Sequence, residues 1–127
     1  MKQKIFKDKY PIFYKEINKK DCQFQSVTDF LDYFEAKIEA HERAPVIARF
    51  DHFTHTKSVN GDINPDILDV QNIIMCFGWE IPSADPVAVR PRSFGITEMA
   101  DKYIVNFMEA PNPVAQQTMI DWVNDIK

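Results

Sequence analysis

The residues FGITEMADKYIVNFME, Phe94 to Glu109, decide the fold class of this chain. Residues 94–98 and 103–109 have the composition of β-strands, and Ala100-Asp101-Lys102 between them is typical of a turn. The connection is too short for a crossover helix, which parallel neighbours require. This stretch therefore predicts an antiparallel hairpin.

Four segments upstream of the hairpin are also predicted to be extended. In residues 73–81, both the odd and the even positions are apolar as far as Glu80. This pattern is typical of a central strand covered on both faces. Within residues 87–92, Pro91 predicts an edge strand or a bulge. Residues 11–17 and 46–55 complete the set, the latter with a period of two.

Three segments are predicted to be helical. Ser26 is an N-cap for a helix that runs to about His41, and Asn112 with Pro113 opens another near the C-terminus. Asn64-Pro65-Asp66 predicts a short helix. The chain is thus expected to be one α+β domain over residues 1–127, a two-layer sandwich of a mostly antiparallel sheet with two long amphipathic helices and a short third helix. A doubly wound α/β fold is disfavoured.

Composition excludes several classes of function. With 127 residues, 45% of them hydrophobic, the chain can build a packed core. None of its three glycines is followed by Lys, so phosphate-binding loops and dinucleotide fingerprints are absent. The net charge of −4 argues against nucleic acid as a partner. No apolar leader or long apolar run indicates a membrane, so a cytoplasmic protein with free Cys22 and Cys76 is expected.

The first 20 residues are basic, since seven lysines against Asp8 and Glu16 give +5. An acidic partner is one interpretation. The other, favoured because no aromatic stacking pattern accompanies the charge, is that the lysines keep an exposed sheet edge from aggregating.

Two clusters carry possible chemistry. The first is Asp51-His52-Phe53-Thr54-His55, whose side chains are those of metal ligands and general bases. On a strand, His52 and His55 point to opposite faces, so they are predicted to be a buried hydrogen-bonded histidine and a solvated one. No metal site and no cofactor are predicted.

The second cluster is Arg90-Pro91-Arg92. Two arginines on an extended segment project to one side, and guanidinium groups bind carboxylate or phosphate through two hydrogen bonds. The competing interpretation, favoured because a net acidic chain offers many partners, is a structural network of ion pairs with Glu80, Glu98 or Asp51. Cys76, in an apolar run, is predicted to be a core residue rather than a nucleophile. Aromatic residues such as Phe77 and Trp79 fill the core by default, and some of them could line a pocket or a dimer interface.

Three runs of sequence resemble a small bacterial family of unknown function: Cys76-Phe77-Gly78-Trp79, residues 88–95 (AVRPRSFG) and residues 107–113 (FMEAPNP). The similarity spans nearly the whole chain, including the segment Phe50-Asp51-His52. It implies a stand-alone bacterial cytoplasmic protein. It implies no activity, substrate or catalytic residue.

Three functions follow as hypotheses. The preferred one is a non-enzymatic module that binds a small anionic or apolar ligand, or a protein, with Arg90 and Arg92 as anion contacts and His52, His55 and Asp51 as further candidates. The second is a cofactor-free enzyme in which His52 or His55 exchanges protons near Arg90. The third is a structural protein that forms a homodimer. If both arginines and a histidine line one pocket, the ligand-binding and enzyme hypotheses are favoured. If they face separate regions of solvent, the homodimer hypothesis is favoured.

Overall fold

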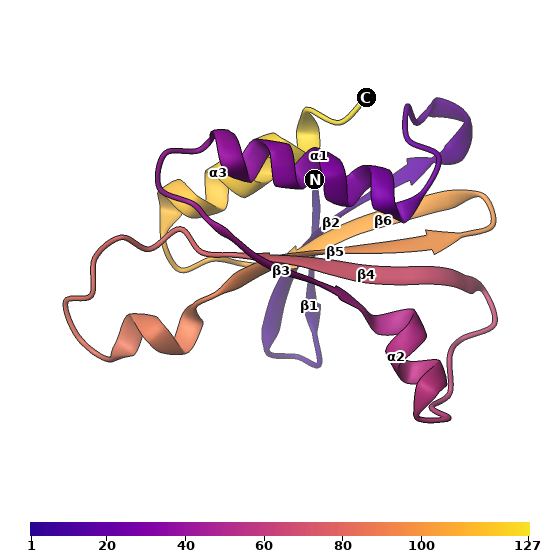
Figure 1. Cartoon of the computed structure of the whole chain (residues 1–127), viewed down its shortest axis with the longest axis horizontal. Coiled ribbons are helices and arrows are strands. Elements are labelled where there is room, and N and C mark those ends of the chain that lie inside the picture. The colour runs from indigo at the N-terminus through magenta and orange to yellow at the C-terminus, as the bar shows by residue number, and fades with distance from the viewer.

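A computed structural model describes residues 1–127, and it has a six-stranded antiparallel sheet with the strand order β1-β2-β6-β5-β4-β3. Two long helices, α1 and α3, lie over one face of this sheet (Figure 1). The predicted α+β class and its helices, two long and one short, are confirmed. The strands are β1 Lys2–Phe6, β2 Tyr10–Asn18, β3 Val46–Asp51, β4 Ile67–Met75, β5 Arg92–Met99 and β6 Lys102–Met108; the helices are α1 Val27–Ala40, α2 His52–Ser58 and α3 Pro113–Asn124, with 3-10 turns η1 Lys19–Asp21 and η2 Asp85–Val89.

The hairpin predicted from residues 94–109 is β5 and β6, two of the four inner strands. Alternate residues of both strands are buried beneath the helices, among them Phe94, Ile96, Tyr103 and Val105. Stacked aromatic rings join the layers, with the ring centroids of Phe34 and Phe94 4.1 Å apart. The hairpin is therefore central because one face of each strand is apolar and the core forms on that face.

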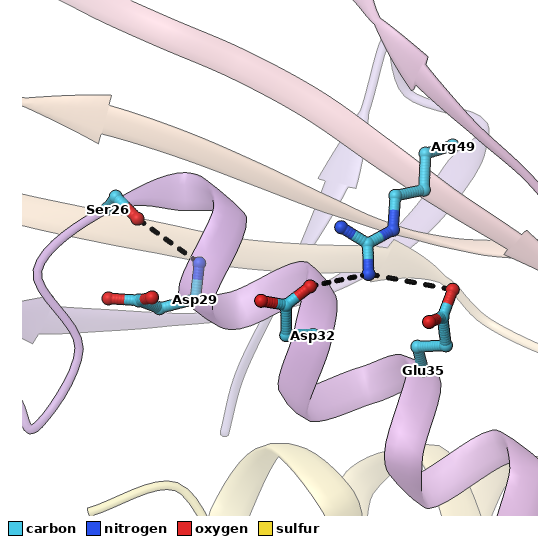
Figure 2. A network of polar contacts seen from close by, with 5 residues as sticks. All are labelled: Ser26, Asp29, Asp32, Glu35 and Arg49. Atoms are coloured by element: carbon cyan, nitrogen blue, oxygen red, sulfur yellow. Dashed lines mark hydrogen bonds and ion pairs between the residues drawn. The ribbon is translucent and has the colours of Figure 1, made fainter.

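Both long helices begin at the predicted caps. The Ser26 hydroxyl accepts a hydrogen bond from the Asp29 backbone N–H, and the Asn112 side chain accepts from Val114 and Ala115. Figure 2 shows the Ser26 cap and the polar contacts that attach α1 to the sheet. Arg49 of β3 reaches the carboxylates of Asp32 and Glu35, at 2.7 and 3.5 Å.

Two predicted elements are wrong around residues 51–66. The strand predicted over 46–55 ends at Asp51, because the Asp51 carboxylate accepts hydrogen bonds from the backbone N–H and the hydroxyl of Thr54 and so caps α2. The short helix predicted after Asn64 is a turn, in which the Asn64 side chain accepts from the Asp66 N–H and β4 follows at once. The short third helix of the fold is therefore α2.

Two more segments differ before β5. The strand predicted over 73–81 is the end of β4, which begins at Ile67 and stops at Met75. Residues 87–92 are not a continuous strand, because η2 occupies Asp85–Val89 and β5 begins at Arg92. Residues 76–91 are instead a long connection between neighbouring strands. Connections of this length are uncommon in compact domains, and many of those that occur carry a function.

The strand β1 was not predicted, and all five of its residues are exposed at one edge of the sheet. Its lysines lie where they oppose pairing with another sheet. The face of the sheet away from α1 and α3 has no long helix over it (Figure 1). None of the helices has the length and apolar character needed to cross a membrane.

Candidate functional site

A pocket of about 510 Å³ lies where the long connection meets the segment between β6 and α3. Both arginines of the candidate anion-binding pair line it. The lining residues come from three separate parts of the chain: Phe77, Gly78, Ser83, Asp85, Pro86, Val89 and Arg90 from the connection; Arg92 from β5; and Ala110, Pro111, Asn112 and Ala115 around the start of α3.

Arg92 joins these parts together. Its Nη1 donates to the Val89 carbonyl at 3.3 Å, and its Nη2 donates to the carbonyls of Met108 and Glu109, the latter at 2.9 Å. Its buried Nε–H has no acceptor in the protein. Burial lowers the pKa of the Arg92 guanidinium. Arg92 therefore holds the wall of the pocket in place and has few donors left for a ligand.

Arg90 has most of its donors free. Its Nη1 donates to the Glu80 carbonyl at 2.8 Å, which is the one hydrogen bond that the guanidinium makes. A guanidinium carries five N–H donors, so about four remain. Neither Arg90 nor Arg92 forms an ion pair with a carboxylate. The alternative of ion pairs with Glu80, Glu98 or Asp51 is wrong, because Glu80 offers its backbone oxygen and Glu98 binds Lys19.

Gly78 makes room for the Arg90 guanidinium. A Cβ atom on Gly78 would lie 2.0 Å from the Arg90 Cζ, closer than any real contact. The guanidinium therefore lies over the backbone of residue 78, a position that only glycine leaves open. The Arg90 side chain thus packs against residue 78, which lies near the other end of the connection.

The rest of the pocket is mixed in character. Phe77, Pro86, Val89, Ala110 and Ala115 supply apolar surface, and the carboxylate of Asp85 stands at the start of η2. Asp85 has no ion pair and no side-chain hydrogen bond. The pocket thus contains two guanidinium groups and a carboxylate that do not neutralise one another by contact.

The other predicted candidates lie at the opposite end of the sheet, on and beside α2 (Figure 1). Asp51 caps α2, so both of its carboxylate oxygens are engaged with Thr54. His52 and His55 do not face opposite ways, because a helix places residues three apart on one side. Both rings pack on Phe50, with centroids 4.6 and 5.4 Å away, and His52 is half-buried rather than buried.

No histidine lines the pocket, so the structure does not bring His52 or His55 to Arg90. No group of three or more His, Cys, Asp or Glu side chains is arranged to hold a metal ion. Cys76 is partly buried, and its sulfur accepts a weak hydrogen bond from the Gly78 N–H at 3.4 Å. Of the aromatic residues considered above, Phe77 lines the pocket and Trp79 is exposed, in contact with Arg43.

Sequence reasoning did not find Asp85, Gly78 or the wall formed by residues 110–112. The available signals were indirect. Pro82 and Pro86 mark a loop, and the three runs that carry the family resemblance all contribute residues to this pocket. What those runs share is spatial proximity, which the order of residues in the chain does not express.

Comparison with known proteins supports that resemblance. No curated protein and no solved structure matches the chain. A family model with the description "Family of unknown function (DUF6858)" matches residues 1–127, and the chain therefore belongs to this family.

Proposed function

We propose that this protein binds a small organic anion in the pocket that contains Arg90 and Arg92. The observation that carries the proposal is the free guanidinium of Arg90, which lines a pocket with apolar walls and has no carboxylate partner. A charged fork without a partner is well suited to bind a carboxylate or phosphate through two parallel hydrogen bonds.

The size and lining of the pocket support the same proposal. Small-molecule sites have volumes of about 300 to 1,000 Å³ and combine mostly apolar walls with a few polar groups. The pocket of about 510 Å³ falls in this range. The Asn112 cap and the first turn of α3 lie beside it, and the positive end of a helix dipole adds to the attraction for an anion.

Calorimetric titration with isocaproate, a carboxylate with a branched apolar tail, and with inorganic phosphate tests this function. We expect isocaproate to bind the wild-type protein and binding to fall at least about tenfold in Arg90→Ala, since that variant loses a charge-assisted fork. Arg49→Ala is the matched control, because Arg49 lies outside the pocket and is paired with Asp32 and Glu35. Failure of both probes to bind, or equal binding by Arg90→Ala, would overturn the proposal.

A homodimer is the second candidate, favoured by the sheet face that carries no long helix. A hollow of about 320 Å³ lies there, lined in part by Phe6, Tyr10, Ile12 and Met108. Phe6, Tyr10 and Met108 are each more than two-fifths exposed. Sedimentation velocity over a range of concentrations, repeated on Met108→Lys, tests it: a dimer that the variant weakens supports this surface, and a monomer throughout contradicts it.

The two free thiols support action in a reducing compartment, and we propose the bacterial cytoplasm.

A further inference from the structure

We infer that the ligand of this pocket is a zwitterion, an α-amino acid with an apolar side chain. The inference rests on the proposed anion-binding function and specifies its ligand class. It comes from Asp85, which lines the same pocket as Arg90 and Arg92 and has an unpaired carboxylate.

A pocket for a simple anion gains nothing from Asp85. A carboxylate near the bound anion repels it, and the repulsion is greater for a phosphate with two negative charges than for a carboxylate with one. No cation of the protein neutralises Asp85 by contact, so the repulsion stays. The pocket is therefore poorly matched to phosphate.

A zwitterion uses both charges. Its carboxylate accepts hydrogen bonds from the free edge of the Arg90 guanidinium, and its ammonium group donates to the Asp85 carboxylate. The absence of an ion pair between Arg90 and Asp85 means that neither group has to break an internal contact before it binds. Oppositely charged groups held apart in one pocket match a ligand whose own charges are separated.

The apolar walls determine which zwitterion fits. Phe77, Pro86 and Val89 belong to the connection, and Ala110 and Ala115 face the pocket from the other side. These groups offer no partner for a charged or hydrogen-bonding side chain, and an unpaired polar group loses free energy on leaving water. Beyond the charged residues, only Ser83 and Asn112 add polar side chains, and Asn112 already caps α3. The walls therefore favour an aliphatic or aromatic side chain.

Three related probes test the inference on the wild-type protein by calorimetry: L-leucine, isocaproate, which lacks the ammonium group, and isoamylamine, which lacks the carboxylate. We expect L-leucine to bind about fivefold more tightly than isocaproate, the ratio that a partly exposed ion pair supplies. Isoamylamine is expected to bind weakest. Isocaproate binding as tightly as L-leucine would overturn the zwitterion while leaving the anion-binding function intact; binding of none of the probes would overturn both.

The variant Asp85→Asn assigns the preference to one side chain. We expect it to bind L-leucine and isocaproate with nearly equal affinity, because the carboxylate that binds the ammonium group is gone. Asp62→Asn, a neutralised acid outside the pocket, is the matched control and should keep the fivefold ratio. An unchanged ratio in Asp85→Asn would contradict the assignment. The wild-type comparison of the three probes does not depend on how well the variant folds.

Discussion

At one end of the sheet, Asp51, His52 and His55 lie within two turns of one another in the chain, and at the other end Arg90 and Arg92 line a pocket built from three separate segments. The first group is dense in reactive side chains, yet the Asp51 carboxylate caps α2, and the two histidine rings pack on Phe50. The second group looks sparser in the sequence, yet Arg90 keeps free donors at a concave surface.

The difference has a physical cause. Neighbours in the chain meet at little cost in conformational entropy, so short polar clusters tend to satisfy one another through caps and turns. Groups that meet only through the fold are held by the scaffold, and their own hydrogen bonds need not be complete. A free donor is thus more informative about binding when it lies where distant segments converge.

The largest expected effect is on Arg92. Arg92→Ala removes hydrogen bonds to three carbonyls that join η2 to the end of β6, and should reduce the free energy of unfolding by about 2 kcal/mol and Tm by roughly 8 °C. Arg90→Ala, with one such bond, should lose less than about 1 kcal/mol. Denaturant titration of both variants checks this. Equal losses of stability in the two variants would contradict the assignment of Arg92 to structure and of Arg90 to binding.

Gly78→Ala should act on binding more than on stability. The new Cβ would occupy the space of the Arg90 Cζ, so the guanidinium must move, and isocaproate should bind about tenfold more weakly because a binding group tolerates displacements of only about 0.5 Å. Calorimetry measures the affinity, and circular dichroism monitors the fold. Gly95→Ala is the control, since its Cβ would meet the Asn106 side chain on the other face. Unchanged isocaproate binding would mean that the position of Arg90 does not matter.

The next prediction concerns Tyr33, which connects the two helices α1 and α3 above the sheet. Its hydroxyl donates to the Trp122 carbonyl and links α1 to α3. Burial, and then the charge of Asp125, raises the pKa of Tyr33 from 10.0 to about 12. Folding therefore favours the protonated Tyr33 hydroxyl. The contribution of this hydroxyl to the free energy of unfolding is complete below pH 10 and declines as the pH rises from 10 to 12.

Tyr33→Phe should lose about 1 kcal/mol at neutral pH, and its deficit relative to wild type should shrink between pH 10 and 12. Urea midpoints of both proteins across this range provide the measurement. A deficit that does not change with pH would contradict the raised pKa.

The smallest effects are expected at the α2 end. Asp51→Ala should cost about 1 kcal/mol through the lost cap, whereas Asp51→Asn should retain most of the stability because an amide oxygen also caps. His55→Ala should change stability by less than about 0.5 kcal/mol and leave isocaproate binding unchanged. Thermal denaturation and calorimetry check these values. Weaker isocaproate binding in His55→Ala would mean that the α2 end of the sheet takes part in binding, contrary to the difference described above.

Much of the fold could be predicted because its signals are local. Ser26 and Asn112 cap helices through their own side chains, and residues 94–109 form a hairpin whose partners are adjacent in the chain. The errors lie where two local signals compete. Asp51 ends a strand pattern by capping α2, and the apolar run 73–81 continues past the last residue that finds a ladder partner, Met75. A periodic pattern does not state where hydrogen-bond pairing stops.

For the site, the residue types alone made Arg90 and Arg92 candidate anion contacts, with structural ion pairs as the alternative, because a guanidinium has the same shape and charge wherever it lies. The antiparallel pairing of β5 and β6 followed equally from residues 94–109, since a turn this short cannot connect parallel neighbours. The tertiary structure alone decided that Arg92 holds the wall, that Gly78 gives Arg90 its place, and that Asp85 shares the pocket. These depend on which distant segments pack together, and packing is settled by the whole core.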